Sequence, residues 1–133
     1  MNKADQHRLL EAEGWLDLDD PVQAAEELEK IEPSQRGHPV ALLLRCRIYL
    51  ATHRPDYTHV IATTLTEQGP DLPHAWFYLA CACSRLNRND DAGAALKQCF
   101  VAAVAKGEEQ EWQERALAER DLDGLWCEDQ MEP

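Results

Sequence analysis

Basic residues are scarce in this chain, and long apolar stretches are missing. Among its 133 residues, 13 Lys and Arg stand against 25 Asp and Glu, which gives a formal net charge of −12. Such an acidic surface repels the phosphate backbone of DNA and RNA, so nucleic-acid binding is not expected. The longest run without Asp, Glu, Lys or Arg, residues 72–84, is too short to cross a membrane. The N-terminus lacks the apolar segment of a secretory signal, and we expect a cytoplasmic protein.

Patterns typical of metal sites and catalysis are also missing. The five cysteines, at positions 46, 81, 83, 99 and 127, do not form the two close pairs of a zinc site, and their odd number leaves at least one thiol unpaired. There is no Gly-rich phosphate loop, no Gly-x-Ser-x-Gly, and no pair of histidines four residues apart beside an acid. We therefore expect reduced thiols, no metal, no cofactor and no catalytic residues.

The charge is unevenly distributed along the chain. Residues 1–35 carry a net charge of −7 and residues 108–133 a net charge of −8, whereas residues 36–107 carry +3. One interpretation is solubility, because the terminal units of a repeat array expose more polar surface. The other is a weakly basic central surface that attracts an acidic segment.

What the sequence does contain is helical periodicity. Apolar residues make up 44% of the chain, which is enough for one compact core in a single domain over residues 1–133. Leu9, Ala12, Trp15 and Leu16 recur in steps of three and four residues, as on the buried side of a helix. No segment alternates β-branched residues in the manner of a strand. The predicted fold class is all-α.

This apolar pattern repeats every 34 residues without a gap. The shift brings residues of similar size into register: Leu9 with Leu43 and Phe77, Ala12 with Cys46 and Ala80, Trp15 with Tyr49 and Cys83, Ala24 with Thr58 and Ala92, and Leu28 with Ala62 and Leu96. It also aligns the turn residues Pro21 and Pro55. The chain is therefore expected to contain three copies of one structural unit.

Turn and cap signals divide each unit into two helices. Asp20 and Pro21 provide an N-cap and a first-turn proline, and Gly107 is suited to the left-handed cap at the end of a helix. The second helix of the first unit is expected over about 21–32, and that of the third unit over 92–105. The expected units cover residues 5–38, 39–72 and 73–106, followed by a helix over 108–120 and an acidic tail over 121–133.

The third unit has the order Trp76-x2-Leu79-Ala80-x2-Cys83, followed by Ala92-x3-Leu96. This order resembles the tetratricopeptide repeat, with Ala80 at that family's small position and Cys83 in place of its usual Tyr. The resemblance implies a right-handed helical-repeat solenoid of three helix-turn-helix units, closed by a C-terminal capping helix.

The two ends of the predicted array differ. In the first unit, Arg8 and Glu11 occupy positions that are usually apolar in the family, which suits a terminal repeat facing water. At the other end, the last helix is expected to turn three residues inward: Trp112, Ala116 and Leu117. In the tail, three apolar residues either fold back on this helix or form a docking segment: Leu122, Leu125 and Trp126.

The cysteines fall into two groups by their positions in the repeat. Cys46, Cys83 and Cys99 lie in columns that are apolar elsewhere, so we expect them to be buried as small hydrophobic residues. Cys81 lies by helix phase on the side of Phe77, and Cys127 lies in the tail, so these two thiols are expected to be exposed.

The resemblance implies that the first helix of each unit lines a concave face. Helix phase then places nine residues in a partner-binding groove: Leu9, Glu13, Leu43, Arg47, Leu50, His74, Phe77, Cys81 and Arg85. Leu43 and Phe77 would supply apolar anchors, while Arg47 and Arg85 would attract acidic side chains. The alternative is that some of these apolar residues pack against the C-terminal helix as it lies across the groove.

The predicted function is that of a non-enzymatic adaptor that binds a protein or peptide segment, with no nucleic acid and no membrane involved. Three alternatives stay open: a small cytosolic secretion-type chaperone on the same fold, a thiol-based redox or metal-binding protein, and a structural module that forms a homodimer.

Overall fold

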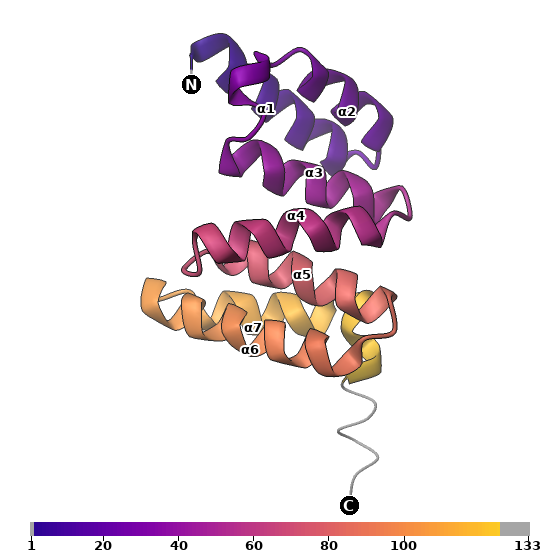
Figure 1. The fold of residues 1–133 in the computed structure, drawn as a ribbon, viewed down its shortest axis with the longest axis vertical. Helices are drawn as coiled ribbons and strands as arrows, with labels where there is room; N and C mark the ends of the chain where they lie inside the picture. The colour runs from indigo at the N-terminus through magenta and orange to yellow at the C-terminus, as the bar shows by residue number, and fades with distance from the viewer. Residues whose placement is uncertain (1, 126–133) are drawn as a thin grey trace, which may run out of the picture.

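The computed structural model describes residues 2–125, and every regular element within them is a helix (Figure 1). The prediction of an all-helical chain is confirmed for these residues. The elements are α1 (Lys3–Asp17), α2 (Pro21–Glu29), the 3-10 helix η1 (Pro33–Gln35), α3 (Pro39–Ala51), α4 (Pro55–Gln68), α5 (Pro73–Arg85), α6 (Asn89–Lys106), α7 (Glu109–Ala118) and the 3-10 helix η2 (Arg120–Leu122).

Capping residues determine where several helices begin and end. The Asp20 carboxylate accepts a hydrogen bond from the Gln23 backbone N–H at 3.1 Å, and Gly107 ends α6 with φ = +71°. Two predicted boundaries were wrong. Helix α2 ends at Glu29, because Glu32 must be extended before Pro33, and α6 begins three residues earlier than expected, at Asn89.

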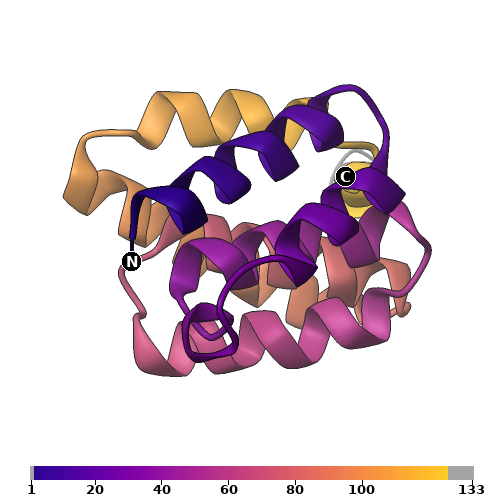
Figure 2. The same ribbon diagram turned by 90° about the horizontal axis from the view of Figure 1, so that it is seen from above.

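Consecutive helices pack in pairs, α1 with α2, α3 with α4 and α5 with α6, and the pairs follow one another along the long axis (Figure 1). Helix α4 bridges the second and third pairs through its packing on α5. Viewed along the long axis, α1 and α7 lie on one side of the stack and α4 lies on the opposite side (Figure 2). The first helices of the pairs and α7 therefore border a common side of the molecule.

Small residues sit where the helices cross. Ala12, Cys46 and Ala80, which the 34-residue shift aligns, are each completely buried. Thr58 lies in another aligned column of small residues, and its buried hydroxyl donates to the Cys46 carbonyl at 3.1 Å. The polar atom of Thr58 thus has a partner inside the core.

The apolar interior is divided into two clusters. One joins α1 and α2 to one side of α3, through Ala41, Leu44 and Ile48. The other extends from Cys46 and Leu50 on the opposite side of α3 to α7 and η2. Helix α3 contributes to both clusters.

The cysteine predictions were correct for three positions and wrong for one. Cys46, Cys83 and Cys99 are buried as expected. Cys81 is only 1% exposed, because η2 packs on α5 beside it, so its predicted exposure was wrong. Burial is the main cause that raises the pKa of the Cys81 thiol, and the nearby carboxylates of Glu119 and Asp121 add to the effect. Cys127 lies outside the described residues.

The C-terminal part packs back onto the third pair. Trp112 and Ala116 are buried as predicted, whereas Leu117 is 64% exposed and its inward placement was wrong. Leu117 follows Ala116 by one helical step, which turns it away from the core. Leu122 is buried and Leu125 packs against the core, so both fold back as one of the two interpretations expected. Trp126 lies outside the described residues.

Candidate functional site

Two adjoining hollows form a groove on the common side of α1, α3, α5 and α7, which we call the inner groove. Their volumes are about 320 and 310 Å³. Both are lined by Arg47, Tyr78 and Arg115, so they are continuous. The first is completed by Glu13, Val40, Leu43, Leu44 and His74, and the second by Leu50, Ala51, Phe77, Cys81, Arg85, Glu119 and Asp121.

The structure brings most of the predicted groove residues together. Four of them line the first hollow, namely Glu13, Leu43, Arg47 and His74. Five line the second, namely Arg47 again together with Leu50, Phe77, Cys81 and Arg85. Leu9 is the exception, because it is buried in the cluster between α1, α2 and α3 and lines neither hollow.

Contacts with α7 determine which of these residues are exposed to a ligand in the groove. Phe77 is only 2% exposed, because the Trp112 ring lies 5.4 Å from its ring and the Arg115 guanidinium lies 5.3 Å from the same ring. Phe77 therefore packs against α7, and its side chain is not accessible to a ligand in the groove, contrary to its predicted role as an apolar anchor. Val40 is 44% exposed and Leu43 is half-buried, so the accessible apolar surface belongs to α3.

The three arginines of the groove are held differently. Arg47 forms an ion pair with Asp17 at 3.1 Å. Arg85 pairs with Asp121 at 2.8 Å and also donates to the Leu50 carbonyl. The Arg115 guanidinium lies 4.8 Å above the Trp112 ring. Within residues 2–125, Arg115 has no carboxylate partner, which leaves its charge available to a ligand.

Two further side chains of α5 supply polar groups to the groove. The ring of His74 lies 4.6 Å from that of Trp112 and nearly perpendicular to it. Partial burial, followed by the charge of Arg115, lowers the pKa of His74, which therefore stays neutral at neutral pH. Burial raises the pKa of Tyr78, so the phenol keeps its proton.

Several groove residues were not predicted from the sequence: Tyr78, Arg115, Glu119 and Asp121. The position of Tyr78 at the groove could have been predicted, because Tyr78 follows His74 by four residues and therefore lies on the same side of α5. The other three belong to α7, η2 and their junction. Their position depends on how the C-terminal segment crosses α5, which no local pattern records.

Within residues 2–125, no group of three or more His, Cys, Asp or Glu side chains is arranged so that it could bind a metal ion. None of the helices described there is long and apolar enough to cross a membrane.

We compared the chain with protein-family models, curated proteins and solved structures, and found no significant match in any of them. The inner groove is therefore interpreted from its own residues.

Proposed function

We propose that this chain is a cytoplasmic, non-enzymatic adaptor that binds an acidic protein segment in its inner groove. Its scaffold would be a right-handed solenoid of three tetratricopeptide-like units with α7 as the capping helix. The observation that carries the proposal is the accessible apolar surface of Val40 and Leu43, which lies in the same hollow as Arg47 and Arg115 in a chain of net charge −12.

The paired helices support the solenoid part of the proposal. Ala12, Cys46 and Ala80 are 34 residues apart, lie on the first helix of successive pairs and are all fully buried. A regular array of this kind repeats the same packing contact in every unit. The first helices α3 and α5, together with α1, line the inner groove, as the concave face of such an array would.

Local charge supports an acidic ligand. Salt screens charges beyond roughly 8–10 Å, so a bound segment responds mainly to the arginines it touches and less to the distant acidic ends. Arg115 lies against two aromatic rings, and arginine on an apolar surface is a frequent carrier of interface energy. An acidic residue next to an apolar one in the ligand would match Arg115 and Leu43.

The thiol-based alternative finds less support. Burial raises the pKa values of Cys46 and Cys99 to about 12, and it also raises the pKa of Cys81. A reactive cysteine needs an accessible thiolate, which burial disfavours. The four cysteines of the described chain are better explained as core residues.

Site-specific photo-crosslinking tests the proposal. A photoreactive residue at position 43 should crosslink to a protein ligand in cell extract, whereas the same residue at Val60, on the outer helix α4 and 63% exposed, should not. Arg115→Glu should reduce the crosslink and Arg115→Lys should retain it, with circular dichroism to confirm that both variants are folded. The test changes Arg115 and leaves Arg85 intact, because Arg85 holds the C-terminal segment through its ion pair with Asp121.

Two outcomes contradict the proposal. Crosslinking from Val60 but not from position 43 would move the binding site to the outer surface. A crosslinked ligand segment without acidic residues, insensitive to Arg115→Glu, would overturn the assigned ligand chemistry.

A further inference from the structure

A second apolar surface lies at the N-terminal end of the stack and shares no lining residue with the inner groove. Leu10, Gly14 and Leu18 are four residues apart, so they follow one another along one side of α1. Leu10 is 67% and Leu18 73% exposed. A hollow of about 430 Å³ adjoins this stripe, lined by Glu11, Gly14, Trp15, Leu18 and Glu27. We call Leu10 and these lining residues the end face.

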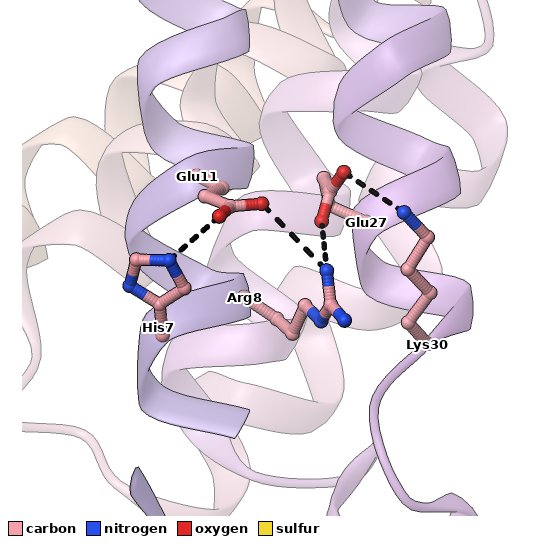
Figure 3. A network of polar contacts seen from close by, with 5 residues as sticks. All are labelled: His7, Arg8, Glu11, Glu27 and Lys30. Carbon is pink, nitrogen blue, oxygen red and sulfur yellow. Dashed lines mark hydrogen bonds and ion pairs between the residues drawn. The ribbon is translucent and has the colours of Figure 1, made fainter. Parts of the chain in front are cut away.

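A network of ion pairs fixes the charged wall of the end face (Figure 3). Arg8 reaches from α1 to Glu27 on α2 at 3.2 Å, and Lys30 binds the other oxygen of Glu27 at the same distance. Arg8 also lies 3.8 Å from Glu11, which contacts His7 at 2.7 Å. The wall is therefore held in place before any ligand arrives.

Gly14 points to the kind of partner that the end face accommodates. A Cβ atom built at this position would meet nothing within 4 Å, so the fold itself has no steric need for glycine there. Glycine is unfavourable inside a helix, where it adds backbone entropy to the unfolded chain. On an exposed apolar stripe, the absent side chain allows the backbone of another helix to approach closely.

The charge around the end face determines the charge of that partner. The two acids that line the hollow, Glu11 and Glu27, are paired with Arg8 and Lys30. Residues 1–35 nevertheless carry a net charge of −7, and the exposed or half-buried acids along and after α1 include Glu13, Asp17, Asp19 and Asp20. A second copy of this chain would bring the same acidic residues against them, and its C-terminal end, residues 108–133, carries −8. Like charges disfavour both arrangements, and a basic partner is attracted.

We propose that the end face docks a basic amphipathic helix, with an apolar stripe against Leu10 and Leu18 and with Lys or Arg on both flanks. Because the two surfaces have separate residues, the chain can hold this helix and the ligand of the inner groove at the same time. Such an arrangement joins a basic partner to an acidic one.

Fluorescence anisotropy of a labelled synthetic helix tests this proposal. The probe is a Leu and Lys peptide with Leu along one side, and its control is a twin in which every Lys is Glu. Gly14→Gln should weaken binding of the basic probe about tenfold or more by filling the approach path. Gly93→Gln is the matched control, because Gly93 lies inside α6 and its Cβ would also meet nothing within 4 Å.

A second pair of variants separates docking from general charge attraction. Leu18→Ser should weaken binding, while Val101→Ser, at another exposed apolar position, 63% exposed and on α6, should not. Equal binding of the acidic twin, or equal affinities of the two Gln variants, would overturn the proposal. Loss of probe binding in Leu43→Ser would place the peptide in the inner groove. Concentration-dependent dimers that Leu18→Ser abolishes would assign the end face to a second copy.

Discussion

At the scale of the residue, His74 in the inner groove makes the stability of the fold depend on pH. Its ring packs edge-on against Trp112, and partial burial followed by the charge of Arg115 lowers its pKa from the ordinary value. In the unfolded chain the histidine recovers its ordinary pKa near 6.5. As the pH falls below that value, the unfolded state takes up a proton that the folded state resists, so stability decreases.

We expect an NMR titration to show a pKa for His74 below the ordinary histidine value near 6.5. Arg115→Gln should move the pKa of His74 back toward its ordinary value, because it removes the second cause of the shift. The urea midpoint of the wild type should fall between about pH 7 and pH 5.5, and His74→Gln should reduce this fall. A His74 pKa at or above the ordinary histidine value would contradict the geometry.

Helix phase was sufficient to place Leu43, Arg47 and His74 at the groove, because each lies on a regular helix with a buried opposite side. The same reasoning put Phe77 and Cys81 on the correct side of α5 but failed to predict their burial. Their exposure depends on α7 and η2, which lie more than thirty residues further along the chain. Periodicity reports the side of a helix and not what covers it.

At the scale of the element, the segment from α7 to η2 forms a cap over the third helix pair. Asp121 pairs with Arg85 at 2.8 Å and its carbonyl accepts from the Ser84 hydroxyl. Leu122 is fully buried beside these contacts. Cys81 lies beneath the same cap, so its thiol reports whether the cap is closed.

Asp121→Ala should accelerate the reaction of Cys81 with a thiol reagent about 3- to 10-fold, because a partly exposed ion pair is worth about 1 kcal/mol. The measurement uses a Cys127→Ser background, and a Cys81→Ala variant identifies the signal. Arg120→Ala, an exposed change in the same 3-10 helix, is the control. An unchanged rate in Asp121→Ala would show that the ion pair does not hold the cap.

Helix beginnings were more predictable than helix ends. Helices α2, α3, α4 and α5 each start at the proline that marked them, because proline fits the first turn and disfavours a helix before it. The early end of α2 follows from Pro33, because proline disfavours the helical conformation at the residue before it. The short helix η2 has no comparable signal, and it depends on packing against α5, which local propensity does not record.

At the scale of the whole molecule, charge is concentrated at the two ends of the stack. Residues 1–35 carry −7, whereas the central residues 36–107 carry +3. Like charges on neighbouring helices repel each other within the screening distance, roughly 10 Å at 0.1 M salt. The folded state brings these charges closer together than the unfolded chain does.

We therefore expect Glu26→Lys, an exposed change in α2, to raise the free energy of unfolding by up to about 0.5 kcal/mol at low salt. The gain should shrink as salt is added, because screening weakens the repulsion that the change relieves. Glu67→Lys, an exposed change in the mildly basic centre, should give no such gain. Equal effects of the two variants in denaturation experiments would contradict the electrostatic argument.

The division of the interior along α3 also has a mechanical consequence. No buried residue described for α1 or α2 belongs to the cluster that runs from α3 to α7, so the apolar packing of the first pair on the rest of the molecule is confined to one side of α3. We expect a pulling force applied between the ends of the chain to separate α1 and α2 from α3 as one unit. That separation removes the end face and takes Glu13 away from the other residues of the inner groove.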